Sequence, residues 1–370
     1  MEIALWVGFI LFILGMLAFD LGVLNRKAHV IRTREALIWS GFVMVLALTF
    51  SVVVYYLYEN GVIRYLDPDT HIPVSGRKAA LDFLTGWIIE QSLSLDNIFV
   101  IALIFAYFNV PRIYQHRTLF WGIMGALIMR GLMIWAGVTL IELFHWVIYV
   151  FGALLLFTAL RMAIARDEKV EPERNPLVRL ARRLYPVTRD FEGERFFTRM
   201  DGRRAITPLF LVLLVIESTD VLFAVDSIPA ILAITRDRFL VFTSNVFAIL
   251  NLRSLYFALS GLLEQFRHLK YSLVFILAYV GVKMLLIDVK KIPTELSLGL
   301  IAAALAAGII SSWLASRREA RERGAQAVGL SDIAGGALGP GAVEENAVED
   351  KRLHRHGDAA GRPAPESPPA

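Results

Sequence analysis

The sequence predicts an all-α integral membrane protein that crosses the bilayer about nine times. Three observations predict this fold class: the length and number of the apolar stretches, the placement of Lys and Arg between them, and a repeated acidic motif. Of the 370 residues, 56% are hydrophobic, and the mean hydropathy is +0.57. Soluble domains average only about 45–50% apolar residues. We therefore expect a lipid bilayer to surround most of this chain.

The apolar stretches are mostly long enough to be spanning helices, since one crossing takes about 20 residues. They cover approximately residues 3–24, 36–58, 80–108, 118–140, 143–165, 206–234, 239–263, 270–288 and 296–315. The first two, with an outer loop, make up an N-terminal region over 1–79, and the last lies in 289–318. The tail over 319–370 is rich in Ala, Gly and Pro, which predicts a disordered segment.

The basic residues predict the orientation of the chain. Lys and Arg are concentrated after the first stretch, in the loop 166–205 and after the last stretch. These three regions lie on one side of the membrane if the N-terminus is outside. Because positively charged loops stay in the cytoplasm, we expect the loop 166–205 and the C-terminal tail to be cytoplasmic. The formal net charge of +4 then reflects topology and contact with the bilayer, and it does not indicate binding of nucleic acid.

Two of the apolar stretches carry the same acidic motif. The motifs read Glu90-Gln-Ser-Leu-Ser-Leu-Asp96-Asn97-Ile-Phe and Glu217-Ser-Thr-Asp220-Val-Leu-Phe-Ala-Val-Asp226, and they align through Asp96 and Asp220. Carboxylates inside a spanning helix are costly, and they usually face the bundle interior or an ion pathway. Two such motifs in matching frames indicate a duplicated ion site.

The match between the two regions continues into the helices that follow. Arg130 aligns with Arg253 in the second helices, and Gly152 aligns with Gly281 in the third. The repeats therefore cover 80–165 and 206–288, with three helices each. Because three is odd, the second copy must cross in the opposite direction. This predicts an inverted repeat, an architecture in which transporters place their site at the midplane between the copies.

The residues predicted to form the site offer hard oxygen and amide ligands. They are Glu90, Asp96, Asn97, Glu217, Asp220, Asp226 and Asn245. Such ligands favour Mg²⁺, Ca²⁺ or Mn²⁺ over Zn²⁺ or copper, and the chain has no cysteine. On regular helices the acids fall on different faces, so we expect breaks near 92–96 and near Pro229 to bring them together.

The basic side chains at membrane depth have two compatible interpretations. Arg130 and Arg253 either neutralise the excess negative charge and hold the bundle together, or pair with the carboxylates only while the site is empty. Asp20, Asp82 and Asp288 lie nearer the ends of their stretches, and we interpret them as interfacial.

Four stretches within these helices resemble the TerC family, which includes the tellurium-resistance membrane protein and the Alx-like manganese exporters. They are residues 90–100, 220–230 (continuing through Thr235), 244–248 and 252–257, and the similarity covers approximately 1–315. The resemblance implies metal-ion efflux, chiefly of Mn²⁺, from a bacterial cytoplasm, with the helix-embedded acids as the site and no permanently bound cofactor. Asn251 stands where the family commonly has glycine, which would add a ligand or alter the approach of the helices.

We therefore expect a transporter that works by alternating access, and not an enzyme. The chain has no Walker-type phosphate loop, whereas clustered carboxylates favour proton coupling; sodium-coupled and passive movement also fit the sequence. The acidic helices lack the Tyr-Asp and Gly-x-Gly-Asp signatures of intramembrane aspartyl proteases.

The alternative is a membrane scaffold of a tellurite or metal-stress resistance complex. It would bind cytoplasmic stress-resistance proteins through the loop 166–205, and its acids would be structural.

Overall fold

The structure is a computed structural model that describes most of the chain before the tail. The described residues are 2–19, 33–68, 71–164, 175–200, 202–259, 269–289, 292–312 and 314–315. All elements discussed below belong to one compact unit, Met1–Ser312. The predicted disordered tail over 319–370 and Asp20 lie outside the described residues.

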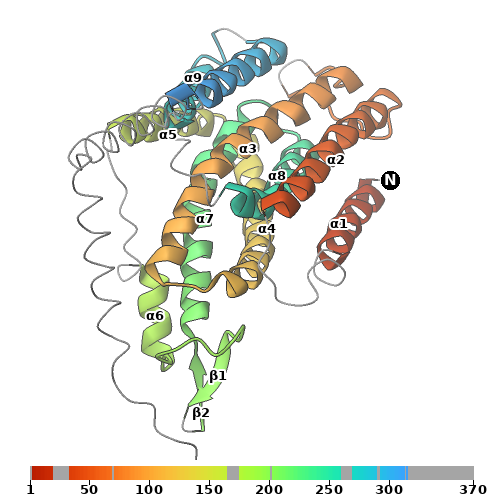
Figure 1. The fold of residues 1–370 in the computed structure, drawn as a ribbon. Helices are drawn as coiled ribbons and strands as arrows, with labels where there is room; N and C mark the ends of the chain where they lie inside the picture. The colour runs from red at the N-terminus through yellow and green to blue at the C-terminus, as the bar shows by residue number, and fades with distance from the viewer. Residues whose placement is uncertain are drawn as a thin grey trace, which may run out of the picture. The chain divides into compact units, whose positions relative to one another are not determined.

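The described part of the chain is almost entirely helical (Figure 1). Its helices are α1 (Glu2–Phe19), α2 (Thr33–Glu59), α3 (Gly76–Tyr107), α4 (Arg112–Leu143), α5 (Val147–Ile164), α6 (Pro176–Leu184), α7 (Pro208–Leu232), α8 (Arg238–Leu259), α9 (Leu269–Leu285) and a final helix, Thr294–Ser312. Seven of them are long and apolar enough to cross a membrane, and Ile3–Ala18 and Tyr271–Leu285 are shorter apolar helices. The all-α polytopic fold is confirmed, whereas the orientation of the termini stays a prediction.

Helix α8 occupies the centre of this unit. It is almost completely buried, whereas the final helix is mostly exposed, and α8 packs against α2, α3 and α4. The outer helices instead expose large apolar side chains such as Leu222, Trp135 and Phe157. Exposed apolar surface on this scale fits contact with lipid. Polar side chains on α8 consequently have to find their partners inside the protein.

The third helices of the two repeats pack with a twofold reciprocity. A Cβ built at Gly152 would lie 3.1 Å from the carbonyl oxygen of Gly281 and 3.1 Å from Leu285, and one at Gly281 would lie 3.0 Å from the carbonyl oxygen of Gly152 and 3.0 Å from Leu156. Both leucines follow their own glycine by four residues. The backbones of α5 and α9, which lie side by side in Figure 1, therefore meet with reciprocal contacts, which fits the predicted repeat.

The expected breaks in the acidic helices do not occur. Helix α3 runs without interruption through 92–96, and α7 runs through Pro229 to Leu232. The hydroxyl of Ser92 donates to the carbonyl oxygen of Ile88 at 2.5 Å, so it bonds back to its own helix. Pro229 lies inside α7, three residues before Leu232, so the helix continues past the one backbone hydrogen bond that a proline cannot donate.

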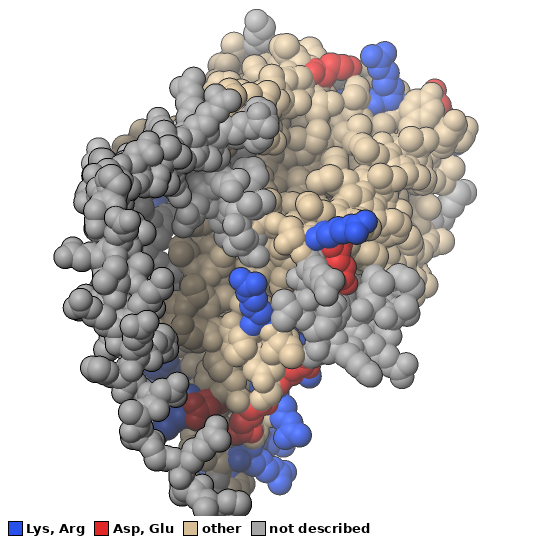
Figure 2. Space-filling model, in the orientation of Figure 1, with Lys and Arg blue, Asp and Glu red and all other residues tan. Residues whose placement is uncertain are grey.

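The loop 166–205 contains a short helix and a β-hairpin that its hydropathy does not predict. Asn175 caps α6 by accepting from the backbone N–H of Leu177 at 2.9 Å, and Pro176 begins the helix. A two-stranded antiparallel hairpin follows, β1 (Phe197–Met200) and β2 (Arg203–Ile206). Figure 2 shows charged side chains gathered most densely at the end of the molecule where Figure 1 places α6 and this hairpin. We call this end the hairpin side.

Candidate ion site

Arg130 of α4 lies at the centre of the candidate site. Its side chain is 1% exposed. The Nε atom donates to Oδ2 of Asp220 at 3.1 Å, and Nη2 donates to Oδ1 at 2.7 Å. Nη1 pairs with Oε1 of Glu90, whose side chain is also 1% exposed. Because Glu90 belongs to α3 and Asp220 to α7, one guanidinium joins acidic side chains of the two repeats.

The charges at this junction do not balance. Glu90 and Asp220 carry two negative charges when both are ionised, and Arg130 neutralises one of them. An ion inside a protein costs several kcal/mol unless it is paired and hydrogen-bonded. The junction therefore favours a further positive charge, which a metal ion or a proton could supply.

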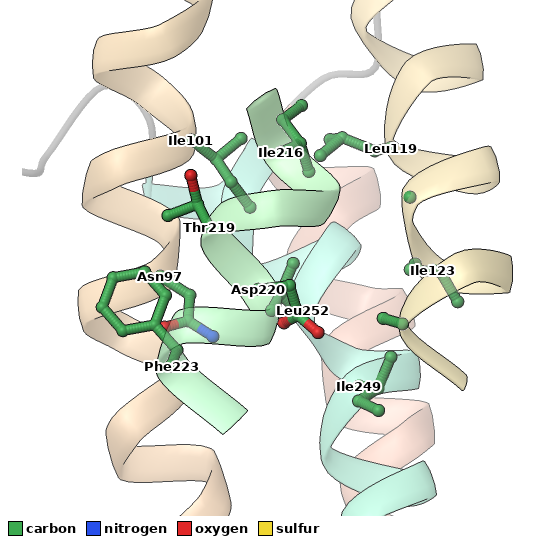
Figure 3. A pocket seen from close by; sticks show the side chains of 12 residues that line it. Asn97, Ile101, Leu119, Ile123, Ile216, Thr219, Asp220, Phe223, Ile249 and Leu252 are labelled. Atoms are coloured by element: carbon green, nitrogen blue, oxygen red, sulfur yellow. The ribbon is translucent and has the colours of Figure 1, made fainter. Parts of the chain in front are cut away.

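A small cavity lies beside Asp220, on the hairpin side of Arg130. Figure 3 shows the side chains that line it. Its volume is about 30 Å³, and a cavity needs roughly 10–15 Å³ to hold a water molecule. Its polar lining comes from Asn97, Thr219 and Asp220, and the rest is apolar, including Ile123 of α4. The cavity has room for a cation with little of its hydration shell, next to a carboxylate.

Asn97 offers an unused ligand atom at this cavity. It is 4% exposed, and its Oδ1 has no hydrogen-bond partner among the described residues. Figure 3 shows its side chain extending from α3 toward α7, near Phe223. A buried amide oxygen without a partner is costly, and coordination of a hard cation would satisfy it.

Glu217 lies one helical turn before Asp220 and fits against a glycine of α4. A Cβ at Gly125 would overlap the Glu217 carboxylate, so the absence of a side chain at position 125 makes room for that carboxylate. Glu217 is half-buried, and none of the residues that the structure describes forms a hydrogen bond or ion pair with it. This second acid of α7 is therefore available to a cation that approaches Asp220.

The remaining predicted site residues are spread over α3, α7 and α8. Asp226 accepts a hydrogen bond from Thr158 of α5 at 2.9 Å. Asn245 is 1% exposed on α8, and its amide atoms have no hydrogen-bond partner in the described part of the chain. Asp96 is half-buried on α3, and Arg253 is 4% exposed on α8.

The expectation that all the acids converge on one point is wrong for this conformation. Across the described ranges, no three His, Cys, Asp or Glu side chains are placed to hold one metal ion. The physical reason is that the helices are unbroken. Glu90 and Asp96, six residues apart, then lie on different faces of α3, and Arg130 fills the space between Glu90 and Asp220.

Three further contacts were not predicted from the sequence. Asn251 donates to Oε1 of Gln91 at 3.2 Å, so it links α8 to α3. Asn175 donates to Oγ of Ser218 at 2.5 Å, which ties the start of α6 to the acidic helix. Asp82, which we expected near a membrane interface, is 2% exposed and accepts from Thr294 at 2.9 Å. Its position two i+4 steps before Glu90 on α3 was the available signal for burial.

The fold and the buried charges together define a polytopic, all-α membrane protein. The chain belongs to the TerC family of integral membrane proteins, whose model matches residues 75–320. It is 48% identical over 313 residues to an uncharacterized membrane protein of Myxococcus xanthus, covering 85% of this chain and 93% of that protein. It is 43% identical over 323 residues to the Escherichia coli K12 protein named "Putative membrane-bound redox modulator Alx", covering 86% and 97%. No solved structure matches it.

Proposed function

We propose that this protein exports a hard divalent cation, principally Mn²⁺, across the bacterial cytoplasmic membrane by alternating access, and that it is not an enzyme. One observation carries the proposal: a buried arginine joins carboxylates of opposite repeats beside a cavity of ionic size. Intramembrane charges of this kind usually mark an ion pathway.

In the proposed cycle, Arg130 acts as the resident cation of the empty site. An ion that enters from the hairpin side meets the Asn97 amide oxygen, the Thr219 hydroxyl and the Asp220 carboxylate. A divalent ion competes with the guanidinium for Asp220 because it carries twice the charge. Once Asp220 is released from Arg130, the link from Glu90 to Asp220 between the repeats is broken. Ion binding would then favour a different packing of the repeats.

The chemistry of the lining favours a hard cation. Carboxylate, amide and hydroxyl oxygens suit Mg²⁺, Ca²⁺ and Mn²⁺ alike. Mg²⁺ gives up its water reluctantly, which disfavours it at a cavity of about 30 Å³ lined by few polar groups. The choice of Mn²⁺ over Ca²⁺ rests on the manganese exporters that the sequence resembles.

The name carried by the Escherichia coli relative is a redox one, and it does not conflict with export. This chain contains no cysteine, so it has no thiol chemistry of its own. We infer that any redox effect would be exerted through the ion that it moves. The hairpin side, where the basic residues gather, would face the cytoplasm.

Purified protein in liposomes tests the proposal. We expect the parent to move Mn²⁺ faster than Mg²⁺, Ca²⁺ or Zn²⁺ when a dye reports the ion inside. Asp220→Asn keeps the shape of the side chain but removes its charge, and it should lower the Mn²⁺ rate at least tenfold. The matched control is Asp288→Asn, an exposed acid after α9, which should stay within twofold of the parent. A parent protein that moves no divalent ion would favour the scaffold alternative.

A further inference from the structure

A second group of buried polar side chains lies at the opposite end of α3 from the hairpin side. Asp82 is 2% exposed, and it accepts a hydrogen bond from Oγ1 of Thr294 at 2.9 Å. Lys283 of α9 donates from Nζ to Oγ of Ser297 at 3.1 Å. The hydroxyl of Tyr279 also lies 2.8 Å from that Ser297 oxygen. The function proposed above does not use any of these groups.

The arrangement joins the two repeats through a helix that belongs to neither of them. Asp82 comes from the first repeat and Lys283 from the second, while Thr294 and Ser297 lie one turn apart at the start of the final helix. In the described residues, the carboxylate and the ammonium form no direct ion pair within 4 Å. When both groups are ionised, their opposite charges attract across the two hydroxyls, and the N-terminus of the final helix favours the negative form of Asp82.

This polar group is connected to the candidate ion site by α3 itself. Asp82, Gly86 and Glu90 follow one another at intervals of four residues, so they lie along one row of the helix surface. Eight residues of helix span about 12 Å. At Gly86, the hydroxyl of Ser244 on α8 comes within 3.0 Å of where a Cβ would be. Ser244 therefore lies between the two polar groups, and α3 is unbroken between them.

We propose that Asp82, Thr294, Lys283 and Ser297 form an outer latch that closes the far side of the ion site. The proposal rests on the function proposed above. In the described conformation the cavity lies on the hairpin side of Arg130, whereas the latch joins both repeats on the other side. For an ion to leave outward, the hydrogen bonds of Asp82 and Lys283 to the final helix have to break. Asp82 is thus a positioning residue, which holds α3 and does not touch the ion.

The absence of native cysteine makes the latch testable by site-directed thiol labelling. Ser244→Cys places a thiol between the latch and Glu90, and Thr219→Cys places one at the hairpin-side cavity. Each reporter is combined, in the full chain in membranes, with Asp82→Asn or with Thr294→Val, which removes only the donor to Asp82. An impermeant maleimide is then applied from either side, and the rate of labelling is measured.

We expect Asp82→Asn to increase labelling of Ser244→Cys at least tenfold from the side opposite the hairpin, and to slow labelling of Thr219→Cys. Thr294→Val should act in the same direction by about threefold, which keeps the test valid if Asp82→Asn does not fold. Asp288→Asn is the matched control and should change neither rate by twofold. The latch is wrong if both latch variants leave the Ser244→Cys labelling rate within twofold of the parent. It is also wrong if labelling of both reporters becomes faster, because a general loosening of the fold would produce that result. None of these rates depends on Mn²⁺, so a failure of the proposed transport would be seen separately in liposomes.

Discussion

The two repeats of this protein pack alike but carry different charges. Helices α5 and α9 meet through Gly152 and Gly281 with reciprocal contacts. By contrast, Glu90 in α3 aligns with Leu214 in α7, and Glu217 in α7 aligns with Leu93 in α3. The reciprocal contact is therefore a feature of the backbone, whereas the charges differ between the two regions. The candidate site arises where the second repeat supplies Asp220 and the first supplies Glu90 and Arg130.

The largest effect should come from removing the cation that joins the repeats. Arg130→Gln leaves Glu90 and Asp220 buried without their partner. Loss of one member of a buried ion pair costs about 3–5 kcal/mol, so the thermal unfolding midpoint in detergent should fall steeply. Adding Glu90→Gln to Arg130→Gln removes one unpaired charge and should recover part of the loss. An Arg130→Gln protein as stable as the parent would show that the pair does not hold the repeats together.

The next effect tests whether α5 and α9 contact each other symmetrically. Gly152→Ala and Gly281→Ala each place a methyl group about 3 Å from the carbonyl oxygen of the other glycine. Overpacking of this kind costs about 1–3 kcal/mol, and reciprocity predicts similar losses for the two variants. Chemical denaturation in detergent measures them. Gly41→Ala, with nothing within 4 Å, is the control and should be neutral or slightly stabilising. A loss of stability in only one of the two glycine variants would contradict a symmetric contact.

A smaller effect should arise where the repeats differ. Gly125 accommodates the Glu217 carboxylate, and the aligned residue in the second repeat is Ala248. Gly125→Ala should displace Glu217 and lower the Mn²⁺ transport rate about tenfold, which corresponds to about 1.4 kcal/mol in activation free energy. Gly299→Ala, which meets no atom within 4 Å, should not change the rate. Transport unchanged in Gly125→Ala would remove Glu217 from the proposed site.

The smallest effect concerns the exposed contact between α5 and the residues after α9. The hydroxyl of Tyr149 and the ring of His145 hydrogen-bond Asp288, and these bonds lower the pKa of Asp288 from its usual value of about 3.9. Because the folded pKa is the lower one, the stabilisation is present above about pH 4 and is lost as the pH falls through the folded pKa. The parent should therefore be slightly more stable than Asp288→Asn at pH 7, and the difference should vanish in acid. An equal difference at both pH values would contradict this assignment.

Much of the scaffold could be predicted from the sequence because hydropathy and charge act over whole helices. The apolar stretches predict the nine apolar helices of the described part, and the aligned glycines and arginines predict the repeat. That an arginine deep in the membrane should pair with the acids also follows from the sequence, because an unpaired charge at that depth is costly. Which acids it meets depends on tertiary packing, so the contacts of Arg130 with Glu90 and Asp220 could be proposed only as one of two interpretations.

Other features could not be predicted because local hydrogen bonds and tertiary contacts outweighed the residue pattern. Serine and proline near the acids predicted broken helices, yet Ser92 bonds back to its own helix and Pro229 lies close to the end of α7. Helix α6 has only nine residues, which is too short for a hydropathy signal. Asp82 was interpreted by its distance from a helix end, but its side chain is buried and bonded to Thr294, which lies far away in sequence.

Direct binding of Mn²⁺ to the purified full chain tests whether Asp220 is the carboxylate shared by Arg130 and the transported ion. Electron paramagnetic resonance reports free Mn²⁺ during a titration with protein. We predict that the parent and Asp288→Asn bind Mn²⁺ alike, and that Asp220→Asn weakens binding at least tenfold while remaining folded. Binding by Asp220→Asn with the affinity of the parent would contradict the site proposed here.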